Sequence, residues 1–456
     1  DAIGSNIRVD TYGWEVKRIL PRINEDINEE WISDKTRHAC DGLSNQRLDT
    51  PYIKYNGKFE KASWSEVFNI IKSKFKNTDK EKICGLTGDL MNMETLYIFK
   101  EFFNKTLGSQ NIESRDNHTY LNPEKRENYL FNSSMNGIEE ADFIFLLGTN
   151  PRFEATILNA RIRKAYLQNK TKIISLNEIG DSTFPYQSLD GNTETVKKII
   201  EGKHEVSDLI KQAKKPMVIM GQSALKSKSS KFMFESIKQF LEENNKLSID
   251  WNALNVISEN ASTVGAFDLG IYKTTNGDNE ILKDLEAHKF EIVYLLGLDS
   301  INFEKKNEFI IYQGSHGDKG AEMADIILPG ATYTEQNGYF TNLEGKLQKA
   351  YKASYPPELA KEDWVIINEL AESMNHRKLF NDKDELDSSL LNQINLFIEK
   401  DKSIKSSTVE NVEFKQEILK VENEDYYYSN AIARASKTML ECKTAKVNLK
   451  LTGTEG

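Results

Sequence analysis

Short apolar runs that end in glycine alternate with amphipathic segments along most of this chain. The runs Ile83–Thr87, Phe143–Leu147 and Ile292–Leu296 are each followed at once by glycine. Continuous apolar runs are typical of strands that are buried on both faces, and helical segments between them indicate βαβ units. The Leu-Leu-Gly sequences at 146–148 and 295–297 are near copies, so we expect them to have the same structural role. The pattern predicts an α/β fold with parallel sheets.

Apolar residues between these runs recur at helical spacing. Helices are predicted at residues 64–75, 93–107, 151–168, 231–244, 281–288 and 363–374. Ser63 and Glu66 have the spacing of a capping box at the start of the first of them. Alternating apolar and polar residues around a turn predict hairpins at 6–20 and 53–59.

Changes in this pattern divide the chain into four regions. We predict a β-rich N-terminal region at 1–59, α/β lobes at 60–215 and 216–380, and a polar, mainly helical extension at 381–456. The second lobe contains a glycine-rich stretch at 312–348, in which tight loops surround a short strand.

Three stretches carry a resemblance to a known family. They are HGDKGAEMADIILPGATYTEQNGYFTNLEGKLQ at 316–348, LLGTNPRFEATILNARIRKAYL at 146–167 and DAIGSNIRVDTYGWEVKRILPRINEDINEEWISDKTR at 1–37. The first resembles the signature of the molybdopterin oxidoreductase superfamily. All three resemble the largest iron–sulfur subunit in the peripheral arm of respiratory complex I, NADH:ubiquinone oxidoreductase. Residues 426–446 are similar to the tail of its mitochondrial and alphaproteobacterial forms.

This resemblance implies two Rossmann-like lobes, like those of formate dehydrogenase and DMSO reductase, which interleave around a cleft. It implies that 1–59 is the remnant of a small iron–sulfur domain, and that the clusters of the full-length subunit lie upstream of Asp1. The chain is then expected to be the carboxyl-terminal half of the subunit. Its partners would be the cluster-bearing half, as a separate chain, and other peripheral-arm subunits that carry FMN and iron–sulfur clusters. The location would be the matrix side of the mitochondrial inner membrane.

Charge and hydropathy exclude two classes of function. The formal net charge is −10, which disfavours nucleic-acid binding because phosphates require a basic face. The sequence contains no apolar run of the roughly 20 residues that a membrane-spanning helix needs. We therefore expect membrane association only through the complex.

The cysteines do not have the spacing of a metal cluster. A cubane cluster needs four thiolates, and the chain has Cys40, Cys84 and Cys442, with no Cys-x-x-Cys pair. We interpret each as a buried small apolar residue. The region that corresponds to the metal ligand of active family members, residues 114–137, contains no matching cysteine, serine or aspartate motif. No molybdenum site is expected.

His316 and Asp318, with Glu322 and Asp325 nearby, are the strongest candidates for acid–base or metal chemistry. Asp318 and Asp325 are better explained as residues that fix loops by accepting backbone N–H bonds, with His316 as a hydrogen-bonded loop histidine. The other five histidines have no spacing suited to zinc.

The segment after the strand Phe143–Leu147 is rich in charge. Arg152 and Glu154 are predicted to form a buried bidentate pair, which is favoured over a ligand-binding role. Asn159, Arg161 and Arg163 follow, and the two arginines could instead face a partner subunit.

The sequence therefore predicts no catalytic, cofactor-binding or metal-binding residue, and no cofactor bound by this chain. The favoured function is a non-redox structural portion of complex I, which supports electron transfer from NADH to ubiquinone. The alternative is a molybdenum or tungsten bis-pterin oxidoreductase of the formate dehydrogenase type. A free soluble binding protein is a third hypothesis.

Overall fold

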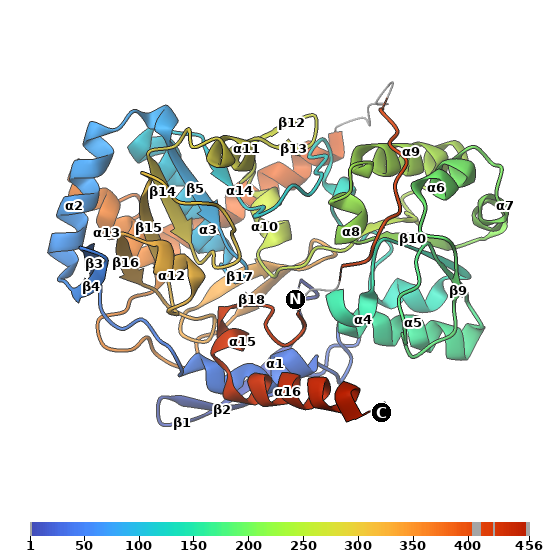
Figure 1. Ribbon diagram of the computed structural model, residues 1–456, viewed down its shortest axis with the longest axis horizontal. Coiled ribbons are helices and arrows are strands. Elements are labelled where there is room, and N and C mark those ends of the chain that lie inside the picture. Colours follow the sequence, from blue (N-terminus) through green and yellow to red (C-terminus); the bar gives the residue numbers. More distant parts are fainter. Residues whose placement is uncertain (1, 404–411, 423–424, 453–456) are drawn as a thin grey trace.

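The computed structural model describes residues 2–403, 412–422 and 425–452. They form two α/β lobes that lie side by side, with a smaller region of hairpins and helices beneath both (Figure 1). None of the helices in these ranges combines the length and apolarity that a bilayer crossing requires.

The first lobe is built on a seven-stranded sheet. Its strands in spatial order are β4 (Lys58–Lys61), β3 (Tyr52–Tyr55), β16 (Ile326–Pro329), β15 (Phe309–Gly314), β14 (Ile292–Leu296), β5 (Ile83–Thr87) and β6 (Ile112–Glu113). The strands from β16 to β6 are parallel, and the β3–β4 hairpin adds antiparallel to β16.

Helices cover both faces of this sheet. The face that presents Tyr294 and Leu328 packs against one group of helices, and the face that presents Val293 and Ile327 packs against another. The first group is α2 (Trp64–Asn77), α3 (Met93–Glu101), α13 (Asp363–Asn375) and α14 (Lys383–Ser403), and the second is α11 (Glu280–Glu286) and α12 (Lys319–Met323). Alternate residues of each buried strand thus supply two separate cores.

The second lobe has a five-stranded parallel sheet. Its order is β11 (Leu254–Val256), β10 (Pro216–Met220), β7 (Phe143–Leu147), β8 (Lys172–Ser175) and β9 (Gln187–Ser188). Its two faces pack on α6 (Thr193–Ile200), α7 (Glu205–Gln212), α8 (Gln222–Leu225) and α9 (Ser230–Glu243), and on α5 (Thr156–Asn169). The α/β fold with parallel sheets and interleaved lobes is confirmed.

The predicted boundary between the lobes, at residue 215, does not separate the strands of the two sheets. β5 lies beside β14, and β7 lies beside β10, so each sheet takes strands from both sides of that boundary. The helix α14 also packs in the core of the first lobe, although it falls in the region predicted as an extension. The repeated strand–glycine–helix pattern is the same in both lobes and therefore carries no information on which strands pair.

Two predicted elements differ in detail from the observed structure. The predicted helix 151–168 is interrupted at Ala155, whose φ of −149° and ψ of 72° separate α4 (Pro151–Glu154) from α5. The 53–59 hairpin is confirmed as β3–β4, but it belongs to the large sheet and not to the N-terminal region. The capping box of Ser63 and Glu66 is confirmed at the start of α2.

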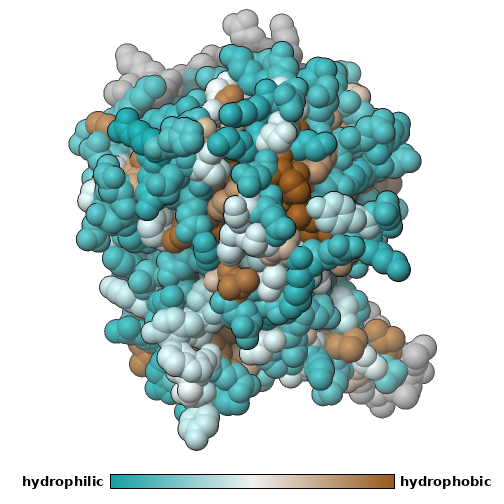
Figure 2. All heavy atoms as spheres, turned by 90° about the vertical axis from the view of Figure 1, so that its left-hand side faces the viewer, coloured by the Kyte–Doolittle hydropathy of each residue, from teal (hydrophilic) through white to brown (hydrophobic). Residues whose placement is uncertain are grey.

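Several of the remaining elements lie beneath the lobes. The hairpin β1 (Ile7–Tyr12) and β2 (Glu15–Pro21) leads to α1 (Asp34–His38) and the 3₁₀ turn η1 (Ala39–Leu43). A second hairpin, β17 (Gly338–Thr341) and β18 (Leu347–Ala350), lies above it, with α15 (Ala431–Ala435) between this hairpin and α1, and α16 (Lys437–Thr452) beside α1 near the bottom (Figure 1). The smaller elements are α10 (Thr263–Asp268), β12 (Thr274–Thr275), β13 (Asp278–Asn279), η2 (Lys80–Lys82), η3 (Phe102–Leu107), η4 (Arg126–Asn128) and η5 (Asn136–Glu140). The face on the left of Figure 1 is mostly hydrophilic, with a small group of hydrophobic residues near its centre (Figure 2).

Candidate functional site: the cleft between the lobes

Ligands of open parallel sheets bind beyond the carboxyl ends of the strands, so the cleft at those ends is the first place to look for a site. Gly148 and Gly297 follow β7 and β14 with φ of 58° and 60°, which confirms that the two Leu-Leu-Gly sequences make the same left-handed turn. Both turns are filled by protein. A Cβ on Gly148 would lie 2.5 Å from the backbone nitrogen of Ala224, and one on Gly88 would lie 1.9 Å from the carbonyl oxygen of Gly297.

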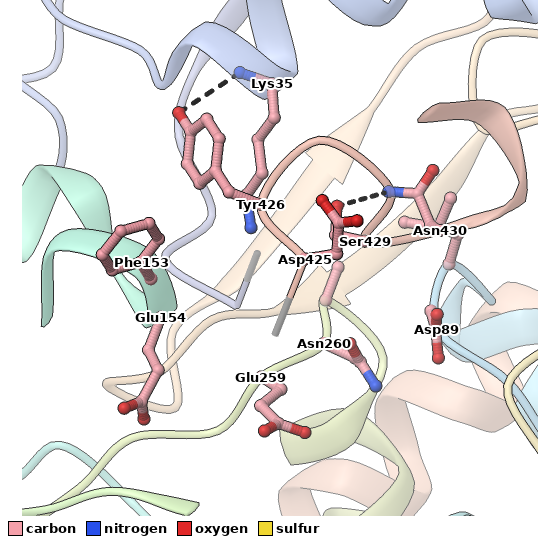
Figure 3. Close-up of a pocket in the computed structure, with 12 residues that line it drawn as sticks. Lys35, Asp89, Phe153, Glu154, Glu259, Asn260, Asp425, Tyr426, Ser429 and Asn430 are labelled. Atoms are coloured by element: carbon pink, nitrogen blue, oxygen red, sulfur yellow. Dashed lines mark hydrogen bonds between the residues drawn. The ribbon is translucent and has the colours of Figure 1, made fainter. Parts of the chain in front are cut away.

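The cavity that remains in the cleft is small and acidic. Its volume is about 30 Å³, and its lining comes from the segments after β5, β7 and β11 together with residues 425–430 (Figure 3). Asp89, Glu154, Glu259 and Asp425 contribute carboxylates, and Lys35 is the one basic side chain in the lining. Sites for drug-sized ligands are usually about 300–1,000 Å³. This cavity has room for water but not for a dinucleotide.

Glu154 is held in place from within its own lobe. Its carboxylate accepts a hydrogen bond from the N–H of Asn150 at 2.7 Å and a longer one from the N–H of Gln222 at 3.4 Å. Desolvation raises the pKa of Glu154, and the backbone N–H bonds from Asn150 and Gln222 act against that rise.

The segment 425–435 passes the cleft, and four of its residues line the cavity there. Tyr426 lies between Lys35, whose N–H donates to the tyrosine hydroxyl at 3.4 Å, and Phe153, whose ring meets it edge-on at 6.3 Å (Figure 3). Burial raises the pKa of Tyr426. Beyond it, Arg434 forms a 2.5 Å ion pair with Asp318 of the first lobe.

The chain on either side of this crossing is also fixed. Before it, the N–H of Leu419 donates to the carbonyl of Gly191, and the side chain of Asn177 donates to Leu419, both in the second lobe. After it, Asp41 accepts hydrogen bonds from the backbone of Lys437 and Thr438 at the start of α16. Residues 412–422 therefore lie on the second lobe, and residues 425–452 run from the cleft to the N-terminal region (Figure 1).

The sequence-predicted residues around His316 have the hydrogen bonds expected of loop anchors. His316 is buried, its Nε2 lies 2.8 Å from the carbonyl of Gly42, and its Nδ1 lies 2.9 Å from the hydroxyl of Ser315. Burial lowers its pKa to about 4, so the ring is neutral near pH 7. Asp318 accepts from the N–H of Lys319 at the start of α12, and Asp325 accepts from the N–H of Ile310.

The predicted pair of Arg152 and Glu154 is wrong. Arg152 is partly exposed and pairs with Asp181 at 2.8 Å, whereas Glu154 accepts from the N–H groups of Asn150 and Gln222. Both residues lie in α4, and helical side chains two positions apart do not face each other. Arg161 is the buried arginine of this segment. Its guanidinium donates to Glu139 at 2.6 Å and to the carbonyl of Ile27 at 3.2 Å, so it joins α5 to the N-terminal region.

The polar residues that follow in this segment, Asn159 and Arg163, also bond to nearby backbone carbonyls. Asn159 donates to the carbonyl of Ser182, and Arg163 donates to the carbonyl of Thr183. Cys84 is buried in β5, as predicted. The prediction is wrong for Cys40, which is half-buried in η1, and for Cys442, which is exposed because most of the residues around it on α16 face solvent. Within the described ranges, no group of three or more His, Cys, Asp or Glu side chains has the geometry of a metal site.

Sequence reasoning missed several buried charged pairs. Glu113 and Arg115 form a buried pair at 2.7 Å where the segment 114–137 begins, and Arg126 pairs with buried Asp268 at 2.6 Å. Asp299, just after β14, accepts from the hydroxyl of Tyr312 at 2.9 Å and from the N–H of Gly320 at 3.2 Å. Burial, with Asp318 nearby, raises the pKa of Asp299 to about 6. These partners are distant in sequence or lie in loops without a periodic pattern.

Comparison with known proteins agrees with this architecture. Residues 47–373 match the model of the molybdopterin oxidoreductase family. The chain belongs to this family. Residues 1–41 match the NADH-ubiquinone oxidoreductase NDSU1/NuoG-like 4Fe-4S domain, and residues 395–442 match the C-terminal domain of the corresponding NADH-ubiquinone oxidoreductase subunit.

Several curated relatives are similar over almost the whole chain. The NADH-ubiquinone oxidoreductase 75 kDa subunit of Reclinomonas americana is 37% identical over 97% of this chain and 67% of its own length. The 78 kDa subunit of Neurospora crassa is 40% identical, covering 98% of this chain and 61% of its own. An NADH-quinone oxidoreductase subunit of Rickettsia bellii is 38% identical, covering 99% and 66%. The chain thus spans about two thirds of the length of these relatives, within the complex I branch of the molybdopterin oxidoreductase family.

A solved molybdopterin-type structure shares the fold at low identity. Acetylene hydratase from Pelobacter acetylenicus aligns with a TM-score of 0.52 and 12% identity, covering 96% of this chain and 76% of its own. The cavity at the carboxyl ends of the strands is too small for the pterin-dinucleotide cofactor that the family implies. The turns after β7 and β14 are packed on protein, and the cavity lining is rich in carboxylates and includes Tyr426.

Proposed function

We propose that this chain is a non-redox structural portion of the peripheral arm of respiratory complex I. In this role it supports the cluster-bearing half of the large subunit while electrons pass from NADH to ubiquinone. The chain acts as part of the proton-translocating NADH:ubiquinone reductase and is itself non-catalytic. Its place is the matrix side of the mitochondrial inner membrane.

One observation carries this proposal: the chain closes most of the space at the carboxyl ends of its own strands. Four residues of the segment 425–430 line the cavity there, and its volume is about 30 Å³. A redox enzyme of the molybdopterin type needs that space for its cofactor and substrate. A scaffold gains from filling it, because side chains in van der Waals contact stabilise the relative position of the two lobes.

Two further features support a role within an assembly. The relatives that cover almost all of this chain are named as NADH-ubiquinone or NADH-quinone oxidoreductase subunits, and each is about half as long again. The match of residues 1–41 to a 4Fe-4S domain model supports the hairpin β1–β2 and α1 as the part of this chain that would meet a cluster-bearing portion.

The proposal is tested by native electrophoresis of mitochondrial extract that contains the tagged chain. We expect the tag to migrate with the band that stains for NADH dehydrogenase activity. In extract from cells that lack the flavin-bearing subunit, the tag should leave that position. A tagged chain that migrates alone in both extracts would contradict the proposal.

A further inference from the structure

A large groove lies between the two hairpins beneath the lobes. Its volume is about 1060 Å³, compared with about 30 Å³ for the cleft. One wall is formed by residues 2–9 with β1, and the other by the hairpin β17–β18 and the residues that follow it. The α15 helix and residues near Lys35 contribute to its floor.

The charge of this groove is opposite to that of the whole chain. The lining contains one carboxylate, that of Asp26. It also contains six cationic side chains: Arg8, Arg22, Lys35, Lys346, Lys349 and Lys352. Arg8, Lys346 and Lys352 pair with carboxylates outside the lining, whereas Arg22 and Lys349 form no ion pair among the described residues. In a chain of net charge −10, this concentration of positive charge attracts an anionic partner.

Both walls present an open strand edge. Among the described residues, β1 pairs only with β2, and β18 pairs only with β17. The inner side of the second hairpin is covered, since the N–H of Tyr339 in β17 donates to Glu94 of α3. The lining includes Ile7, Arg8 and Val9 of β1 and all four residues of β18. Unpaired strand edges present rows of N–H and C=O groups that accept an added strand.

Exposed aromatic rings lie at one end of these walls. Tyr12 and Trp14 at the tip of the first hairpin are 81% and 74% exposed, and Tyr351 and Tyr355 after β18 are 73% and 58% exposed. The rings of Trp14 and Tyr355 meet edge-on at 4.7 Å, so the two walls touch at this end. Tyrosine, tryptophan and arginine are the residues most enriched at the energetic centres of protein interfaces.

We propose that this groove binds an extended acidic segment of a partner polypeptide, which pairs its backbone with the open edge of β1 or β18. Its carboxylates lie against Arg22 and Lys349, and its end packs on the aromatic rings. The inference depends on the proposed function only for the identity of the partner, which would be the cluster-bearing portion of the subunit. The binding chemistry stands on the groove alone. A small anion would use the charge but not the strand edges or the rings.

The test uses the full 456-residue chain and a fluorescein-labelled peptide of about ten residues, in which Glu and Asp alternate with Thr and Val. A peptide with Lys and Arg in place of the acids is its matched control. Fluorescence anisotropy should show binding of the acidic peptide only, with affinity that falls as salt rises from about 50 to about 200 mM. Hydrogen exchange should show new protection of amides in β1 or β18.

Variants separate the groove from general charge. The double substitution Arg22→Glu and Lys349→Glu should raise the Kd at least about tenfold. The substitution Lys17→Glu, on the same hairpin but outside the lining, should leave it unchanged. Equal binding of both peptides, an unchanged Kd in the double variant, displacement by millimolar inorganic phosphate, or binding without amide protection would each overturn the proposal. Co-migration with complex I is measured separately, so peptide binding can fail while the proposed function holds, and the reverse.

Discussion

The buried carboxylate of Asp299 gives a quantitative test of the packing beneath the glycine-rich stretch. Its pKa is raised from 3.8 to about 6, first by burial and then by Asp318. The folded protein therefore holds this proton more tightly than the unfolded chain between these two values. The stability that comes from the protonated form is lost as pH rises through this window. At about pH 7.5 the ionised group costs about 3 kcal/mol, since each pKa unit corresponds to about 1.4 kcal/mol.

The substitution Asp299→Asn removes that cost while it preserves the local hydrogen bonds. The asparagine oxygen can accept from the N–H of Gly320, and its amide can donate to the hydroxyl of Tyr312, both of which now bond to Asp299. We expect the variant to be more stable than the parent by about 2–3 kcal/mol at about pH 7.5. The difference should fall below about 1 kcal/mol at about pH 4, where the parent is protonated as well.

The assay is urea unfolding followed by tryptophan fluorescence at both pH values. Asp250→Asn is the matched control, because Asp250 is an exposed loop carboxylate and its substitution should change stability little at either pH. A stability difference for Asp299→Asn that is the same at both pH values would refute the reasoning. So would a variant that is less stable than the parent at the higher pH.

Three further perturbations follow from the packing. Arg161→Met should destabilise the chain by about 3–5 kcal/mol in urea unfolding, because it leaves the buried carbonyl of Ile27 without its donor and removes one partner of Glu139. A loss below about 1 kcal/mol would contradict a structural role for Arg161. Gly148→Ala should cost more than about 2 kcal/mol, since it combines a positive φ with contact against Ala224, whereas Gly57→Ala, with a positive φ and open space around it, should cost about 1 kcal/mol. Equal losses would show that the turn after β7 is not tightly packed. In the native chain, a thiol reagent should modify Cys442 first. Cys84 should react only after denaturant is added, because Cys84 is buried and burial raises the pKa of its thiol. Rapid reaction at Cys84 would mean that β5 is accessible.

Local signals in the sequence were sufficient for most individual elements. The capping box of Ser63 and Glu66 fixes the start of α2, and the glycine after each apolar run fixes the turn that ends β7 and β14. Both signals depend on residues within a few positions of each other, so they do not depend on long-range contacts.

The order of strands within each sheet could not be predicted in the same way. The pairing of β5 with β14 joins residues that are more than 200 positions apart, and the apolar runs of both lobes have the same pattern. The predicted pair of Arg152 and Glu154 does not form because the two residues are two positions apart on one helical turn, so their side chains point in different directions. The passage of residues 425–435 along the cleft has no periodic signal, because this segment mixes aromatic, polar and small apolar residues. Its partners, such as Phe153 and Asp318, lie far away in the sequence.

Elemental analysis of the natively purified chain shows whether the cleft of this molybdopterin-type fold is closed by the protein itself. If it is, molybdenum and tungsten together should be present at less than about 0.1 atom per chain. About one atom of either metal per chain, accompanied by pterin fluorescence after acid extraction, would contradict it.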